Sequence, residues 1–532
     1  MMEHRLNERA PHPRELVFPG AAFPGASEVI RDTYQGLWNA MELTDAEIEA
    51  RERELTLTTK LIIDFCDEYL SPRAYTAAML APILETATTA DTNTQAREAL
   101  RIYTNNTTES EEEKRYVIGL ASDRPVIANF WHESVATRYT SDPALQSLLQ
   151  SSKPAEVSIQ QWGTPSKSIE PRYINELASS VNLESLLIKA GELLAQLDPS
   201  TATNDSQTLD RAHQAEALLA PLCEIIGFDA LAMALYSHVH VLRAMFTGNL
   251  APLQQAQNII NERGDKEQVD GDVQELFGVV FGDNIHEQII EHGAGHGIMM
   301  GEGYCTGECL RVNWRLKSVG SLAKKLDARS PENIPLDIIG ATVTTKDVHQ
   351  IASRLKRILE RAKNNKHVIL TPTSERDKAI HVKGPTEYIE AIREGLSYES
   401  VDAMREDVDV VAVAEGAHQV CKVTLVFKQP EKDEKPERPD LRAEIQITTE
   451  SDRVENRIGK AAHMLYKLVK HLGISDDSID KEHYAQDLAL IHARKQHLGA
   501  TNYDQLTSGS LVRANKLYEE LKNPAAHVSS AA

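Results

Sequence analysis

One segment of the chain, RVNWRLKSVGSLAKKLDARSPENIPLDIIGATV at residues 311–343, places three secondary-structure signals in close succession. Polar and apolar residues alternate from Arg311 to Arg315, which is typical of a half-buried strand. Ser318 is a favourable N-cap for a helix that we expect to end near Leu326. The apolar run LDIIGATV then indicates a buried strand. The segment therefore predicts a strand, a short helix and a second strand.

Four side chains suited to phosphate binding converge on the start of this helix. Arg315 and Lys317 are two apart on an extended backbone and point the same way, and Ser321 and Lys325 are four apart and share one helix face. Backbone N–H groups at a helix N-terminus also favour an anion. Asp337, at the start of the next strand, is placed to hold a metal ion against bound phosphates. A solvated basic helix with a capping serine is the alternative interpretation.

A second segment, AEIQITTESDRVENRIGKAAHMLYK at residues 443–467, adds a carboxylate and further polar side chains. Glu444 and Gln446 lie on the same side of a predicted strand, and the intervening isoleucines pack behind it. His463 is followed by a Tyr and a Lys at helical spacing. Burying Glu444 and Asp337 on apolar strands would be costly without a metal or a basic partner. A buried Glu satisfied by a neighbouring Arg is the alternative.

Together the two segments resemble the synthetase domain of the RelA/SpoT family. That family shows R-x-K-x-x-x-S-x-x-x-K, then a strand-borne Asp, then E-I-Q-I-R-T followed by A-A-H-W-x-Y-K. The matching residues of this chain are Arg315, Lys317, Ser321 and Lys325, then Asp337, then Glu444 and Gln446, and finally Ala461, Ala462, His463, Tyr466 and Lys467. The resemblance implies an α+β fold with a mainly helical N-terminal half, followed by a mixed, nucleotidyltransferase-like β-sheet flanked by helices.

The resemblance also implies an activity, namely transfer of the β,γ-pyrophosphate of ATP to the 3′-hydroxyl of GDP or GTP, which makes (p)ppGpp and releases AMP. Arg315, Lys317 and Lys325 would neutralise the phosphates. Asp337 and Glu444 would hold Mg²⁺, and Glu444 could also polarise or deprotonate the attacking hydroxyl. The nucleotide-binding set that the resemblance implies is Arg315, Lys317, Ser321, Lys325, Tyr398, Gln446 and His463.

The acceptor side departs from the family pattern. The family stacks its guanine on the Tyr of N-G-Y-Q-S-L-H; the best counterpart here is Tyr398, with Asp402 in place of the His and Tyr388 as a rival. Other departures are Thr342 and Thr448 where the family has Arg, and Arg457 where it has a second Glu. Two alternatives therefore stay open: toxin-like transfer to another 3′-hydroxyl, such as a transfer RNA end, and a catalytically degenerate nucleotide-binding regulator.

The N-terminal half contains a weaker resemblance, to the hydrolase domain of long RelA/SpoT proteins. The helical pattern TAAMLAPILETAT places Ala81 and Pro82 where the family has the metal-binding His-Asp pair, and the upstream family His has no counterpart near Leu57. GLASDR keeps one carboxylate, Asp123, which by itself cannot build a metal site. We therefore expect a degenerate hydrolase-like domain, with an unrelated helical bundle as the alternative.

Length and composition are consistent with these assignments. A chain of 532 residues suggests two or three domains. A net charge of −22 makes broad electrostatic capture of nucleic acid improbable, leaving RNA only as an alternative acceptor. No apolar run is long enough for a membrane span, and an odd, sparse set of five cysteines fits a reducing cytoplasm. The sequence does not indicate an oligomeric state.

The expected segments are a flexible arm (1–27), a helical hydrolase-like domain (28–197), a linker and helical connector (198–285), the synthetase domain (286–473), and C-terminal helices with a tail (474–532).

The remaining sequence patterns are a group of His and Cys residues, one amphipathic helix and four strands. His292, His296, Cys305 and Cys309 have spacings that zinc accepts, although a Gly-rich connector with incidental ligands is the favoured interpretation. An amphipathic helix is expected from Lys346 to Ala362. HVILTP and KAIHVKG are expected to be short strands, and CKVTLVFK and RAEIQIT an antiparallel pair.

Overall fold

The computed structural model describes the chain in segments: residues 33–34, 44–66, 70–85, 90–132, 156–163, 170–264, 266–281, 285–290, 298–305, 310–327, 335, 337–372, 378–413, 419–428, 440–458, 480–499 and 506–522. It divides into two compact units. Unit 1 comprises residues 1–156, 171–226 and 490–532, and unit 2 comprises residues 157–170 and 227–489. The expected arm at residues 1–27 lies outside the described residues.

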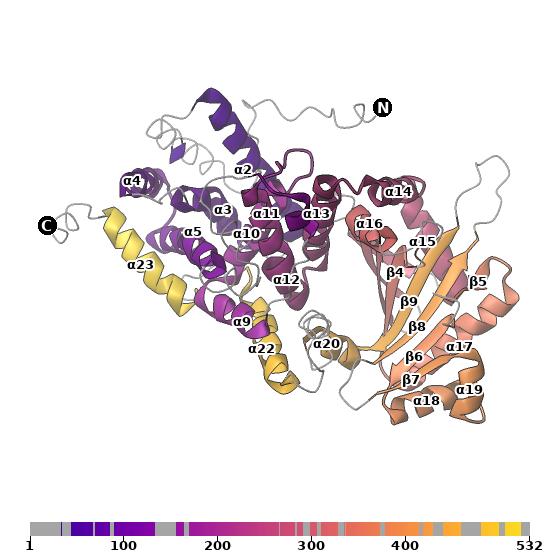
Figure 1. Cartoon of the computed structure of the whole chain (residues 1–532). Coiled ribbons are helices and arrows are strands. Elements are labelled where there is room, and N and C mark those ends of the chain that lie inside the picture. Colours follow the sequence, from indigo (N-terminus) through magenta and orange to yellow (C-terminus); the bar gives the residue numbers. More distant parts are fainter. Residues whose placement is uncertain are drawn as a thin grey trace. The chain divides into compact units, whose positions relative to one another are not determined.

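Unit 2 is built around one mixed β-sheet, which confirms the α+β class (Figure 1). Its strands run in the order β1-β2-β3-β4-β9-β8-β6-β7, and β5 also pairs with β8. The β4–β9 and β6–β7 pairs are parallel, and the other pairs are antiparallel. The strands are β1 (Ile285–Ile290), β2 (Met300–Cys305), β3 (Leu310–Leu316), β4 (Ile339–Thr345), β5 (Val368–Leu370), β6 (Ile380–Gly384), β7 (Asp409–Ala412), β8 (Val420–Phe427) and β9 (Leu441–Thr449).

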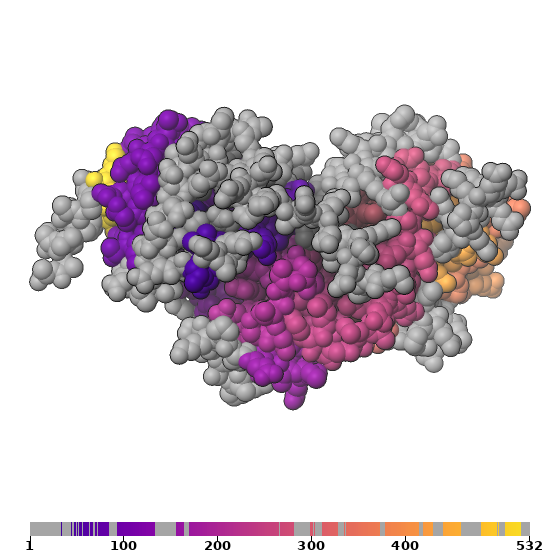
Figure 2. Space-filling model, turned by 90° about the horizontal axis from the view of Figure 1, so that it is seen from above, coloured from indigo at the N-terminus to yellow at the C-terminus, as the bar shows by residue number. Residues whose placement is uncertain are grey.

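One face of the sheet forms the core of unit 2. From Leu441 to Ile447 every second residue of β9 is buried, and Ala443, Ile445 and Ile447 pack in one cluster with helices α14 to α19. This alternation is the period-2 pattern expected from the sequence. The helices of unit 2 are α8 (Ile159–Gly163), α13 (Asp229–Thr247), α14 (Leu250–Asn261), α15 (Lys266–Phe281), α16 (Val319–Asp327), α17 (Val348–Asn364), α18 (Thr386–Leu396), α19 (Val401–Asp407) and α20 (Glu450–Ile458). In Figure 2, α14 and α15, drawn in magenta to pink, form part of the outer surface of this unit.

The local structure of unit 2 agrees with the sequence signals. The amphipathic helix expected at residues 346–362 is α17, which begins after the N-cap Asp347; this carboxylate accepts a hydrogen bond from the Gln350 N–H at 2.9 Å. The four expected strands are confirmed as β5, β6, β8 and β9. Because β8 and β9 pair antiparallel over seven residue pairs, the polar side chains of both strands share one face.

Unit 1 is helical, as expected for the N-terminal half. The C-terminal helix α23 belongs to this unit and packs on α5, although a long stretch of sequence separates them. Helix α22 (Lys481–Ala493) spans the boundary at residue 490. The other elements of unit 1 are α2 (Asp45–Cys66), α3 (Pro72–Glu85), α4 (Ala90–Asn106), α5 (Glu111–Phe130), α9 (Pro171–Ser180), α10 (Leu183–Gln196), α11 (Ser206–Gln214), the π-helix η3 (Ala215–Leu219), α12 (Ala220–Ile226), the 3₁₀ turn η5 (Arg494–His497) and α23 (Ser508–Lys522).

The unit boundaries differ from the segments expected from the sequence. Residues 227–285, expected to be part of a separate connector, join unit 2 because α14 and α15 contribute Ala256, Val273 and Phe277 to the core beneath the sheet. The polar stretch expected to be a linker at residues 198–210 is ordered: Asp205 caps α11 and accepts a hydrogen bond from the Thr208 N–H at 2.8 Å.

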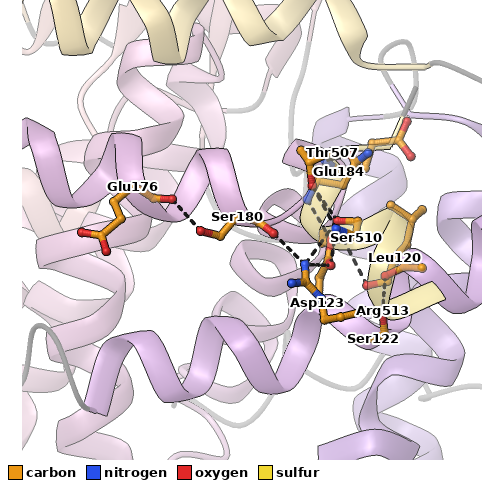
Figure 3. Close-up of polar contacts among 12 residues, drawn as sticks. Leu120, Ser122, Asp123, Glu176, Ser180, Glu184, Thr507, Ser510 and Arg513 are labelled. Carbon is orange, nitrogen blue, oxygen red and sulfur yellow. Dashed lines mark hydrogen bonds and ion pairs between the residues drawn. The ribbon is translucent and has the colours of Figure 1, made fainter. Parts of the chain in front are cut away.

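Two buried carboxylates hold the C-terminal segment in unit 1 (Figure 3). Asp123 of α5 accepts hydrogen bonds from Ser510 at 2.8 Å and from the Arg513 guanidinium at 2.6 Å, and both donors lie on α23. Glu184 of α10 accepts one from the Gly499 N–H at 2.9 Å. Burial raises the pKa of Asp123 and of Glu184, and the hydrogen bonds offset part of that rise.

Among the described residues, none of the helices combines the length and apolar character needed to cross a bilayer.

Candidate functional site

The face of the sheet opposite the core is polar. Register pairs Arg315 with Gly340, Gly340 with Glu444 and Glu444 with Thr424, so these residues form one row across β3, β4, β9 and β8. A second row, one pleat further along, crosses six strands. We call these two rows the polar face, because residues paired in register project on the same side of a sheet. The second row consists of Asn313, Thr342, Gln446, Lys422, His381 and Asp409.

The N-terminus of α16 lies close to α13. A Cβ atom on Gly320 would come 2.2 Å from the Ser237 carbonyl oxygen, so the contact requires glycine. The Gly320 N–H donates to Ser237 Oγ at 3.3 Å, and the Ser321 N–H donates to Ser318 Oγ at 3.4 Å. Ser318 is therefore the N-cap, as expected. These two backbone groups, which the sequence indicated for anion binding, already have partners within the protein, so the cationic side chains must supply most of the attraction for phosphate.

Lys317 and Lys325 both contact Asp337. Both ammonium groups donate to Asp337 Oδ2, that of Lys317 at 2.5 Å. Burial would raise the pKa of Asp337, but the two lysines outweigh it and hold this pKa well below its usual range. Burial also lowers the pKa of Lys317 to about 8, against the opposing effect of Asp337. Two cations thus share one carboxylate, which leaves the cluster with a net positive charge.

Arg315 lies beside this cluster on the exposed side of β3. Its Cγ and Nε atoms lie 3.7 Å from the position that a Cβ of Gly340 would take. The arginine side chain therefore lies over Gly340 of β4, the strand that pairs with β9. Arg315 is exposed and available to a ligand on the polar face.

Glu444 has a separate set of partners. The Lys422 ammonium lies 3.3 Å from Glu444 Oε1, and the Gln446 amide donates to the same oxygen at 3.0 Å. The contact between Glu444 and Gln446 confirms that these residues share one side of β9. Lys422 was not predicted as a site residue. The signal that could have identified it is the single charged residue of the strand VCKVTLVF. In register Lys422 pairs with Gln446, and Glu444 is its diagonal neighbour.

Each of the two carboxylates has an oxygen of the kind that Mg²⁺ binds. Oδ1 of Asp337 and Oε2 of Glu444 accept no hydrogen bond from the described residues, and carboxylate oxygens are ligands that this ion prefers. The described parts of the chain contain no cluster of three or more His, Cys, Asp or Glu side chains. Two protein ligands are nevertheless sufficient where nucleotide phosphates and water supply the others.

The two tyrosines considered for acceptor stacking occupy different environments. Tyr398 follows α18, is partly exposed, and donates from its hydroxyl to Asp407 at 2.9 Å. It packs against the core cluster beside α18 and α19, and burial raises its pKa to about 12. Tyr388 is buried within that cluster, and its hydroxyl has no partner among the described residues. Of the two, Tyr398 is the accessible ring.

A second pair of polar side chains, not predicted from the sequence, lies at the far end of the polar face. His381 Nδ1 is 2.7 Å from Asp409 Oδ2, and His381 is also the register neighbour of Lys422. Asp409 follows Asp407 on the chain, so this pair lies near the turn that carries Tyr398. The polar face therefore extends from the lysine cluster toward the acceptor side that the sequence indicated.

The positions that depart from the family pattern have structural roles. Thr342 belongs to the polar face, while Thr448 is buried and its carbonyl accepts a hydrogen bond from Thr345 Oγ1 at 3.1 Å. Arg457 of α20 forms an ion pair with Asp229 at 2.5 Å. None of these three residues adds a cation to the cluster around Asp337.

Several predicted residues cannot be placed. His463, with Tyr466 and Lys467, lies outside the described residues, as do the candidate zinc ligands His292, His296 and Cys309. The fourth of these, Cys305, is part of β2, but its side chain is not described.

In unit 1, α3 carries Ala81 and Pro82 where the hydrolase family has its metal ligands, and Asp123 is engaged by α23. We therefore predict that the full-length protein does not release pyrophosphate from ppGpp in the presence of Mn²⁺, because neither Ala nor Pro binds a metal. The measurement is release of labelled pyrophosphate from 3′-labelled ppGpp. Release that is lost on chelation of the metal would contradict the degenerate-hydrolase assignment.

Comparison with protein-family models and with curated proteins returned no match. A functional assignment therefore depends on the contacts of the polar face and of the lysine cluster.

Proposed function

We propose that unit 2 is a pyrophosphokinase of RelA/SpoT type, with a nucleotidyltransferase-like fold, that transfers the β,γ-pyrophosphate of ATP to the 3′-hydroxyl of GDP or GTP. The observation that carries the proposal is the convergence of Lys317 and Lys325 on Asp337, at one end of a polar face that also presents Arg315 and Glu444. Cations that meet a carboxylate with a free oxygen are suited to a polyphosphate bound with a metal.

The chemistry follows from the charges. The acceptor oxygen attacks the β-phosphorus, the bond from that phosphorus to the bridging oxygen breaks, and AMP leaves. Negative charge that develops on the phosphates is stabilised by Arg315, Lys317 and Lys325. Asp337 and Glu444 would hold Mg²⁺, which when bound neutralises further phosphate charge. Glu444 would also accept the hydroxyl proton.

The test is a transfer assay with ATP labelled on its terminal phosphates. The full-length protein with Mg²⁺ is offered GDP, GTP, ATP or bulk transfer RNA as the acceptor. We expect label on GDP or GTP, with equimolar AMP. Label on RNA instead would support the toxin-like alternative. If a folded protein transferred label to none of them, the degenerate-regulator alternative would replace this proposal.

The acceptor site can be tested at Tyr398. We expect Tyr398→Ala to raise the acceptor KM about tenfold to a hundredfold and the ATP KM little, because stacking contributes roughly 1–3 kcal/mol per base. Tyr398→Phe should have a milder effect, since it keeps the ring and loses only the hydrogen bond to Asp407. Steady-state kinetics with each substrate varied in turn provides the measurement.

Tyr388 serves as the comparison in this experiment. Because Tyr388 is buried, Tyr388→Ala should destabilise unit 2 by about 3–5 kcal/mol through the cavity that it leaves. A folded Tyr388→Ala protein with a raised acceptor KM, alongside an unaffected Tyr398→Ala protein, would transfer the stacking role to Tyr388.

A further inference from the structure

The cations and carboxylates of the candidate site are paired with one another. Asp337 Oδ2 accepts from both Lys317 and Lys325, and Glu444 Oε1 accepts from Lys422. Each carboxylate proposed to hold a metal is therefore bound to at least one ammonium group from the surrounding site. The same ammonium groups are the ones that would bind phosphate.

The net positive charge of this site disfavours the binding of a divalent cation without a nucleotide. The candidate site combines two carboxylates, Asp337 and Glu444, with four cations: Lys317 and Lys325 pair with Asp337, Lys422 pairs with Glu444, and Arg315 lies over Gly340. The four positive and two negative charges leave a net charge of +2. Such a site repels a divalent cation and attracts a polyphosphate. The complex of ATP with one Mg²⁺ carries a charge of −2 and matches it.

We infer that the metal and ATP bind to this site only together, because the ammonium groups beside each carboxylate repel the metal until the phosphates neutralise them. The inference rests on the proposed function and adds an order to it. In the nucleotide-free protein, Lys325 and Lys422 compete with the metal for Asp337 and Glu444. When ATP enters, Lys325 and Lys422 would turn from a carboxylate to a phosphate, and Asp337 and Glu444 would then hold the metal without an ammonium group on the same oxygen.

Exposure indicates that this exchange is possible without unfolding. The side chain of Lys325 is 41% exposed and that of Lys422 is 30% exposed, so both can turn toward a ligand on the polar face. Lys317 is only 14% exposed and is held at the end of β3. Lys325 and Lys422 are thus the mobile pair, and both should tolerate replacement by Met, which keeps the length of the side chain and removes its charge.

The coupling is reciprocal by thermodynamic necessity. If ATP raises the affinity for the metal by some factor, then the metal raises the affinity for ATP by the same factor. A variant that frees one carboxylate should therefore bind metal alone more tightly and show a smaller gain when nucleotide is added. A variant that was merely damaged would bind the metal more weakly, so tighter binding of the metal alone together with a smaller gain from the nucleotide is specific to this inference.

The experiment measures Mn²⁺ binding by electron paramagnetic resonance, with the full-length protein and no nucleotide. We expect weak binding to the wild-type protein. Lys325→Met and Lys422→Met should each bind Mn²⁺ about tenfold to a hundredfold more tightly, since a positive charge beside the carboxylate is removed. Lys428→Met, an exposed lysine just beyond β8, is the matched control and should behave like the wild type.

A second titration adds α,β-methylene-ATP, which cannot be cleaved at the bond that the reaction breaks. The gain in Mn²⁺ affinity beyond that of the Mn²⁺–analogue complex in solution should be at least tenfold for the wild type and smaller for both variants. The inference is overturned if the wild-type protein binds Mn²⁺ alone as tightly as the variants. It is also overturned if folded Lys325→Met and Lys422→Met proteins match Lys428→Met.

Failure of this inference and failure of the proposed function give different results. If the wild-type protein transferred label to GDP or GTP but neither variant gained Mn²⁺ affinity, the proposed coupling would be wrong and the proposed activity would stand. If Mn²⁺ and the ATP analogue raised each other's affinity but label was transferred to no acceptor, the proposed reaction would be wrong. The site with the lysine–carboxylate ion pairs would then bind a nucleotide without catalysing transfer. Circular dichroism and thermal melting establish that each variant is folded.

Discussion

Replacement of Asp337 by Asn should abolish pyrophosphate transfer while leaving the fold intact. The change removes a charge and almost no volume, but it leaves Lys317 and Lys325 facing each other without a counter-ion and takes away a proposed metal ligand. We expect the rate of transfer to fall by about a thousandfold or more, equivalent to roughly 4 kcal/mol of transition-state stabilisation. Labelled-ATP transfer at saturating acceptor measures the effect.

A matched control, Asp327, lies at the end of α16, the helix that carries Lys325. The side chain of Asp327 is exposed and accepts a hydrogen bond from the Asn249 side chain at 2.6 Å, whereas Lys317 and Lys325 donate to Asp337. Asp327→Asn makes the same chemical change and should leave transfer within about twofold, because exposed polar contacts contribute little. Full activity in a well-folded Asp337→Asn protein would refute the assignment of Asp337 to the metal and its phosphates.

The parts of unit 2 that could be predicted are those whose signals are local. The N-cap Ser318 and the alternation of β9 both depend on residues within one turn or one strand of each other. Periodicity determines which side chains share a face, so the contact between Glu444 and Gln446 followed directly from the sequence.

What could not be predicted depends on how distant strands and helices meet. Lys422 contacts Glu444 only because β8 pairs with β9 in one particular register, and the sequence of either strand alone does not determine that register. The use of the Gly320 N–H by Ser237 likewise requires α13 to pack on α16. The expected anion site at the helix terminus was therefore reduced by a tertiary contact.

The C-terminal helix is the clearest example of such a long-range contact. Asp123 was interpreted as the remaining carboxylate of a lost metal site, and the sequence provided no partner for it. Its partner, Arg513, lies 390 positions away and returns to unit 1 after the whole of unit 2. A guanidinium group now neutralises Asp123, which gives this residue a structural role without a metal.

The second large effect is expected at this position. Asp123 is fully buried and accepts hydrogen bonds from the Asn182 N–H at 2.7 Å, from Ser185 at 2.9 Å, and from Ser510 and Arg513 of α23. Asp123→Ala removes the acceptor from all four donors and leaves the guanidinium without its counter-ion. We expect the free energy of unfolding of unit 1 to fall by about 3–5 kcal/mol, as for other buried pairs that lose one partner.

The loss should be local, because the carboxylate ties α23 to α5 and contacts nothing in unit 2 among the described residues. Hydrogen exchange followed by mass spectrometry should show faster exchange in residues 506–522 and unchanged exchange in β8 and β9. Glu98→Ala is the matched control: its exposed ion pair with Arg101, three residues along α4, should contribute less than about 0.5 kcal/mol. If Asp123→Ala matched Glu98→Ala in stability and in exchange, α23 would have to be held by its apolar contacts alone, and the buried carboxylate would not be what fastens the C-terminal helix to unit 1.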